Sequence, residues 1–133
     1  MIGMPGEALR VSHSVWKQSL TDALHSAFAH HYENNDFYRA QCDAVGVSPV
    51  DIGGYEDLDK IPLLPVGMFK QAGAHILLTV GLADIETEIR STGTGGVPSV
   101  ARRDALTTTR ASVGILGGYR DFFGISKGAG LFL

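Results

Sequence analysis

The sequence predicts a mixed α/β fold in which helices come first, a β-hairpin follows and a further helix comes after it. Apolar side chains between positions 12 and 35 recur every four residues, which is the spacing of one helix face. Residues 84–90 alternate apolar and charged side chains, as a half-exposed strand does. The stretch STGTGGVPS at 91–99 gathers turn-forming residues between strand-like and helix-like sequence.

The N-terminal part is predicted to contain two helices. Residues 1–11 are expected to form a loose leader. Residues 12–35 are expected to form an amphipathic helix, which packs against the rest of the protein through one stripe of apolar side chains. A shorter helix is predicted from Asp36, with Gly46 as its stop. The stripe of the first helix consists of Trp16, Leu20, Leu24 and Phe28.

The middle of the chain is predicted to be broken into short pieces. Ser48 and Pro49 favour a bend, and Pro62 and Pro65 exclude one continuous helix. We expect short helical pieces near 55–59 and 65–71. Two apolar, strand-forming runs then predict strands at 75–80 and 84–90.

The glycine-rich stretch is predicted to join the two strands of a hairpin. Pro98 breaks residues 97–103 too much for a helix, whereas Asp104 is a good N-cap for a helix that reaches Gly124. Residues 130–133, GLFL, are expected to start a buried strand. The chain shows no repeat or linker, so residues 12–133 are predicted to form one domain. The spacing that predicts the last helix is that of Leu106, Thr109, Val113 and Leu116.

Composition argues against several classes of function. The net charge is −3 and the eleven basic residues do not gather in one patch, so nucleic acid is not an expected partner. No run reaches transmembrane length and the N-terminus lacks a signal-peptide pattern, so we expect no membrane association and a cytoplasmic location. Cys42 is interpreted as a buried, inert thiol, and the scattered histidines predict no metal site.

Glycine-rich stretches can bind phosphate in several ways. The Walker pattern fails because no lysine follows Gly95 or Gly96, and the dinucleotide pattern fails because Pro98 occupies its third glycine position. A hairpin loop whose hydroxyls and backbone N–H groups wrap a polyphosphate fits the residues. An ordinary turn fits them as well, and composition alone favours the turn.

STGTGGVPS resembles the phosphate-loop signature of the acyl-adenylate-forming ligase superfamily. The preceding residues are similar to the N-terminal segments of phenylacetate-CoA ligases and of the acyl-protein synthetases of bacterial bioluminescence, and the resemblance covers residues 30–125. IPLLPVGMFK and Ser99 favour the acyl-protein synthetase branch. The residues that carry the upstream similarity are Phe37, Tyr38, Arg39, Asp51, Ile52, Glu56, Asp57, Leu58, Ile61, Pro62, Phe69 and Lys70.

The resemblance implies that a carboxylic acid attacks ATP to give an acyl-adenylate and pyrophosphate, with Mg²⁺ assisting, before acyl transfer to a thiol or a protein acceptor. It also implies phosphate binding by one run of loop residues. That run is Ser91, Thr92, Gly93, Thr94, Gly95 and Gly96. Relatives often carry a lysine where this chain has Ser99, and either Arg102 or Arg103 supplies that charge or the two form a solvated surface pair.

Members of that superfamily have several hundred residues, with an adenylate site and a mobile C-terminal domain. The 133 residues here are therefore expected to be part of a larger adenylating-enzyme fold: a fragment, a separately encoded piece or a degenerate relative, inactive alone. Its partners would be the remainder of the enzyme or another subunit. The alternative is a non-catalytic binding or assembly module that associates with itself. No residue here is assigned as catalytic.

Overall fold

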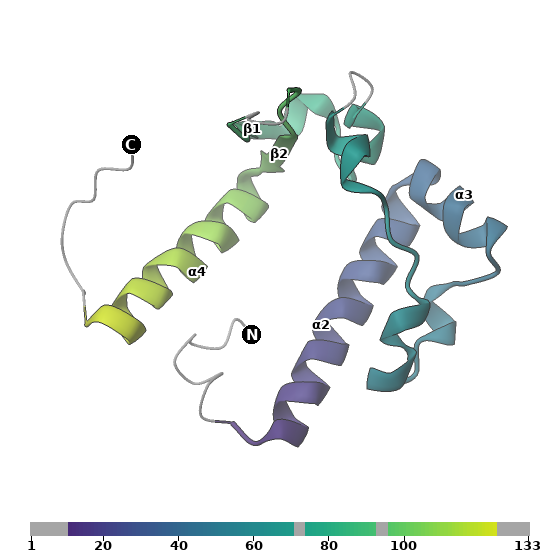
Figure 1. Ribbon diagram of the computed structural model, residues 1–133, viewed down its shortest axis with the longest axis horizontal. Coiled ribbons are helices and arrows are strands. Elements are labelled where there is room, and N and C mark those ends of the chain that lie inside the picture. Colours follow the sequence, from purple (N-terminus) through teal and green to yellow (C-terminus); the bar gives the residue numbers. More distant parts are fainter. Residues whose placement is uncertain (1–10, 71–73, 93–95, 125–133) are drawn as a thin grey trace.

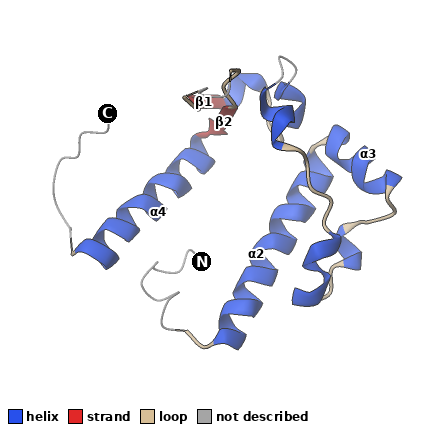
Figure 2. Ribbon diagram, viewed as in Figure 1, coloured by secondary structure: helices blue, strands red, loops and turns tan. Residues whose placement is uncertain are grey.

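The computed structural model describes residues 11–70, 74–92 and 96–124, and it confirms the predicted order of helices, hairpin and helix (Figures 1 and 2). The expected leader up to Arg10 and the expected strand at 130–133 lie outside the described residues. The regular elements are α2 (His13–Asn34), α3 (Asp36–Ala44), β1 (Ile85–Arg90), β2 (Val100–Asp104) and α4 (Ala105–Phe123). Short 3₁₀ helices span Pro49–Asp51, Tyr55–Lys60, Val66–Lys70, Ala74–Leu77 and Leu82–Asp84.

Helix α2 begins where predicted, because the Ser12 side chain accepts a hydrogen bond from the Val15 N–H at 3.4 Å. Its predicted apolar stripe is buried only at the C-terminal end. Phe28 is 3% exposed, whereas Trp16 is 41% and Leu24 40% exposed. The difference arises because α3 and the 3₁₀ turns supply buried partners around Phe28.

The buried core lies between α2, α3 and the 3₁₀ turns that follow them. Phe28, Cys42 and Ile52 form its centre. Partly buried side chains pack around them, namely Tyr32, Tyr38, Val47, Leu58 and Ile61. Cys42 is fully buried and carries a free thiol, and burial raises its pKa. This confirms the interpretation of Cys42 as a buried thiol, and a raised pKa makes it a poor nucleophile.

Helix α3 stops as predicted at a glycine. Gly46 has a φ of +71°, and its N–H donates to the Asp43 carbonyl at 3.1 Å. The left-handed conformation suits glycine, so the chain turns here without strain. The predicted helical pieces near 55–59 and 65–71 appear as 3₁₀ helices rather than α-helices.

The strand predicted at 75–80 is wrong. Ala74–Leu77 forms a 3₁₀ helix instead. The buried Asn35 amide donates hydrogen bonds to the carbonyls of Ile76 and Leu78, each at 2.9 Å. These carbonyls therefore find a side-chain partner from the start of α3, where a strand would have needed a neighbouring strand.

Strands β1 and β2 form the predicted antiparallel hairpin, with Glu88 opposite Arg102 and Arg90 opposite Val100. The pairing shifts between Ile85 and Thr87, near the open end of the hairpin. The other end leads into residues 91–99, so the glycine-rich stretch is the hairpin loop. The apolar side chains of β1 are only partly covered, since Ile89 remains 45% exposed.

Helix α4 leaves the hairpin on the side away from α3 (Figure 1). The Asp104 side chain caps it by accepting from the Thr107 N–H at 2.8 Å, as predicted. It ends at Gly124, whose φ is +66°. Although apolar side chains recur along α4, none of its residues is buried. No described helix combines the length and the apolar character that crossing a membrane requires.

Candidate functional site

The hairpin loop is closed at its neck by two serines. The Ser91 N–H donates to the Ser99 carbonyl at 3.0 Å, and the Ser99 N–H donates to the Ser91 Oγ at 2.9 Å. The Ser91 hydroxyl thus acts first as an acceptor within the protein, while its own hydrogen remains able to donate. Sequence alone did not indicate this closing role of Ser91.

The structure describes three of the six predicted phosphate-binding residues, namely Ser91, Thr92 and Gly96, and Gly93, Thr94 and Gly95 lie outside the described residues. All three are exposed at the end of the hairpin. Gly96 has a φ of +106°, which L side chains rarely adopt. The described loop residues therefore expose hydroxyl groups and glycine backbone to solvent, and these are groups with which a turn can bind an anion.

A small charged cluster lies on the hairpin stem beneath the loop. One oxygen of Glu88 accepts from Arg90 Nε at 2.9 Å and from Arg90 Nη2 at 2.7 Å, and the other is 3.0 Å from Arg102 Nε. The hydrogen bond from Arg90, followed by the charge of Arg102, holds the pKa of Glu88 below its usual value. Arg102 is thus an ion-paired residue of the hairpin stem. The signal in the sequence that could have indicated this pair is the presence of opposite charges, Glu88 and Arg102, on the two sides of the glycine-rich stretch.

A groove of about 670 Å³ lies between α2, the hairpin and the start of α4. Its walls include Ala27 of α2, Leu78, Ile85 of β1, and Leu106 and Arg110 of α4. The described loop residues 91, 92 and 96–99 are not among the residues that line it. The groove is therefore a feature separate from the loop.

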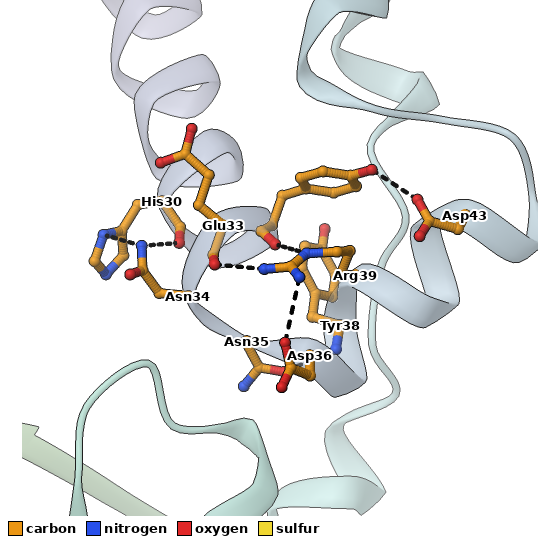
Figure 3. Close-up of polar contacts among 9 residues, drawn as sticks. His30, Glu33, Asn34, Asn35, Asp36, Tyr38, Arg39 and Asp43 are labelled. Atoms are coloured by element: carbon orange, nitrogen blue, oxygen red, sulfur yellow. Dashed lines mark hydrogen bonds and ion pairs between the residues drawn. The ribbon is translucent and has the colours of Figure 1, made fainter.

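Two of the three FYR residues of the sequence resemblance, Tyr38 and Arg39, connect α3 with α2 and with the residues that follow α3 (Figure 3). Arg39 donates to the carbonyls of Tyr32, at 2.8 Å, and Glu33, which belong to the last turn of α2, and it pairs with Asp36 at 3.3 Å. Tyr38 donates through its hydroxyl to the Pro62 carbonyl at 2.7 Å. Their observed contacts hold elements together rather than facing an open site.

The acidic stretch of the resemblance is also structural. Asp57 accepts from the N–H groups of Gly53 and Gly54 at 3.0 and 3.1 Å and from Lys60 Nζ at 2.6 Å. These partners, with Lys60 the largest contribution, lower the pKa of Asp57. Leu58 packs on the core beside it. The motif thus shapes the turn that supports α2 and α3.

His25 and His30 contact polar groups that are distant in sequence, and the ring centroids of His30 and His31 are 5.6 Å apart. His30 Nε2 lies 3.1 Å from the Thr79 hydroxyl, and His25 Nε2 lies 3.0 Å from the Pro49 carbonyl. Burial, then the neighbouring His30, lowers the pKa of His31. Within residues 11–70, 74–92 and 96–124, no three His, Cys, Asp or Glu side chains gather as a metal site would require.

The geometry defines an α/β segment with a helical core and a hairpin that carries a closed, glycine-rich loop. The chain belongs to the acyl-protein synthetase family LuxE, whose family model matches residues 6–126. This confirms the resemblance to bioluminescence-type acyl-protein synthetases. The likeness to phenylacetate-CoA ligases stays a prediction.

Three relatives carry the description long-chain-fatty-acid–luciferin-component ligase. The protein from Vibrio harveyi is 37% identical over 94 residues, which are 71% of this chain and 23% of that protein. The protein from Aliivibrio fischeri is 37% identical over 87 residues, 65% of this chain and 21% of that protein. The protein from Photorhabdus luminescens is 36% identical over 80 residues, 60% of this chain and 63% of that protein. The chain thus spans less than a quarter of the length of the first two.

Proposed function

We propose that this chain is the N-terminal segment of an ATP-dependent acyl-activating ligase, and that its hairpin loop binds the phosphates of ATP. The observation that carries the proposal is the closed, exposed loop at the end of the hairpin in a member of the acyl-protein synthetase family. The complete enzyme would join a carboxylic acid to ATP, release pyrophosphate and pass the acyl group to a thiol or protein acceptor, in the cytoplasm.

The described residues fit a phosphate group. Thr92 offers an exposed hydroxyl, and Gly96 leaves the backbone open because nothing lies within 4 Å of where a Cβ would be. The two hydrogen bonds between Ser91 and Ser99 hold the loop ends together, which lowers the cost of ordering the loop around a ligand. We extend the role to Gly93, Thr94 and Gly95, and Mg²⁺ would neutralise part of the phosphate charge.

The relatives' descriptions name a long-chain fatty acid and a luciferin component. By analogy, we propose a carboxylic acid with an apolar chain as the substrate and a protein as the acyl acceptor. The chemistry of acyl transfer itself would need residues supplied by the remainder of the ligase, because this segment offers positioning and phosphate binding.

Calorimetric titration of the 133-residue chain with ATP and Mg²⁺ tests the loop. We expect Thr94→Ala to weaken binding about ten-fold or more, as the loss of one charge-assisted hydrogen bond would. Gly95→Ala should also weaken binding, because the added methyl group restricts the backbone and its close approach to phosphate. The matched controls are Thr109→Ala on exposed α4 and Gly67→Ala, whose added Cβ would meet nothing within 4 Å. Both controls should leave the affinity unchanged. Absent binding, or equal binding by all variants, would contradict the proposed role of the loop.

The second candidate is a non-catalytic module that associates with itself. It is favoured by the exposed apolar side chains of α4, among them Ile115 at 56% and Leu116 at 67% exposure. Sedimentation across a concentration series separates the two candidates. Reversible self-association together with no ATP binding would support the module.

A further inference from the structure

Helix α4 carries a broad apolar face that the described residues leave largely exposed. Leu106, Val113, Leu116 and Phe123 follow one another at helical spacing and are 54%, 47%, 67% and 71% exposed. Ile115 and Phe122 are each 56% exposed and lie on another side of α4, three residues before and four residues after Gly118. A helix that is apolar over so much of its circumference is normally buried on more than one side.

A second face of α4 is made of small residues. Thr107, Ala111, Gly114 and Gly118 are separated by four, three and four residues, so they share one face of the helix. Glycine is among the poorest helix formers, so two of them weaken α4 unless another backbone approaches closely. A Cβ built at Gly114 or Gly118 would meet nothing within 4 Å. The described part of the chain therefore makes no use of the space that the glycines leave.

The presence of two exposed faces on α4 limits which polypeptide can pack against this helix. A symmetric dimer buries the same single patch on each copy, so it would cover one face and leave the other open. The aligned segments are only 23% and 21% of the first two relatives, and the family match ends at residue 126, just beyond α4. The greater part of a family ligase is thus left to supply the cover.

We infer that α4 is an internal helix of the assembled ligase, packed between two layers of the polypeptide that follows the aligned segment in the relatives. The apolar face takes up side chains of one layer, and the glycine face lets the backbone of the other approach closely. This inference rests on the proposed role as an N-terminal segment, but it does not depend on ATP binding by the loop.

Hydrogen exchange in a chimaera tests the inference without ATP. Residues 6–126, which the family model matches, replace the corresponding segment of the Vibrio harveyi relative, and exchange of the α4 amides is compared with that in the isolated chain. We expect fast exchange in the dilute isolated chain and protection at least about 100-fold higher in the chimaera. Equally fast exchange in the chimaera, a chimaera that does not fold, or protection in the isolated chain that grows with its concentration would overturn the inference.

Gly118→Leu gives the sharper test, because the two contexts should respond in opposite directions. In the isolated chain, leucine should raise the helicity of α4, since it is the better helix former. In the chimaera, the same side chain should block the close approach and remove the protection of α4. Gly67→Leu is the matched control, because Gly67 also has open space around it and lies outside α4. Full protection of α4 in the Gly118→Leu chimaera would contradict a packed glycine face.

Discussion

At the scale of single residues, Tyr38 shows how a motif residue can serve the core. Its ring packs edge-on against Phe28, and its hydroxyl donates to the Pro62 carbonyl. Burial, and then the neighbouring Cys42 thiol, raises the pKa of Tyr38 to about 12. The folded protein therefore favours the neutral phenol more than the unfolded chain does.

This difference predicts an alkaline loss of stability. A raised phenol pKa contributes stability that is complete below the unfolded value of about 10 and is lost as the pH rises through about 12. Urea unfolding at a series of pH values should show that loss, and Tyr38→Phe should reduce it. Tyr119→Phe on α4 is the control and should keep the full loss. A Tyr38→Phe profile that matches the parent would show that this phenol is not responsible.

Two side-chain contacts of the hairpin are set by which residues face each other across its strands. The neck hydrogen bonds of Ser91 depend on which residue the hairpin register brings opposite it, which composition does not reveal. The pairing of Arg102 with Glu88 likewise follows from the hairpin register. A role of Arg102 or Arg103 toward phosphate stays a prediction. The roles of Gly93, Thr94 and Gly95 stay predictions.

At the scale of elements, side chains connect α2 and α3 by forming hydrogen bonds with backbone groups at the helix ends that have no partner within the helix. The end of a helix leaves carbonyl groups without helical partners, and Arg39 donates to two of them while Asn35 caps the start of α3. Asn35 also reaches the carbonyls of Ile76 and Leu78. This long-range contact explains why an apolar run with strand-like composition did not become a strand.

Removing Arg39 should loosen that joint. Arg39→Ala is expected to lower the free energy of unfolding by about 2 kcal/mol, because two charge-assisted hydrogen bonds to carbonyls are lost. Arg39→Lys should recover only part of it, since lysine lacks the guanidinium fork. The measurement is urea unfolding followed by Trp16 fluorescence. Asp36→Asn removes only an exposed ion pair and should lower the free energy of unfolding much less. If Asp36→Asn lowered it as much as Arg39→Ala does, the ion pair and not the hydrogen bonds to the carbonyls would be the stabilising contact.

At the scale of the whole molecule, the buried residues are distributed unevenly along the described part of the chain. The buried centre lies among α2, α3 and the adjoining 3₁₀ turns, whereas α4 contributes no buried residue. Stability should therefore be concentrated in the N-terminal helices when the chain is studied alone.

Unfolding of the isolated chain should accordingly not follow a single transition. We expect helicity, measured by circular dichroism, to fall at lower urea concentration than Trp16 fluorescence, because α4 unfolds first. Gly114→Ala and Gly118→Ala should each stabilise α4 by about 1 kcal/mol and shift only the first transition. Coincident curves for the two signals would contradict this division.

The sequence by itself determined the order of the elements, the capping residues Asp104 and Gly46, the hairpin position and the family resemblance. These features depend on neighbouring residues, whose spacing and backbone preferences can be read along the chain. Only the tertiary structure decided the fate of residues 75–80, the partial burial of the α2 stripe, the closure of the loop by Ser91 and Ser99, and the exposure of α4. Each of these depends on which distant groups supply hydrogen bonds or cover apolar surface, and local sequence does not contain that information.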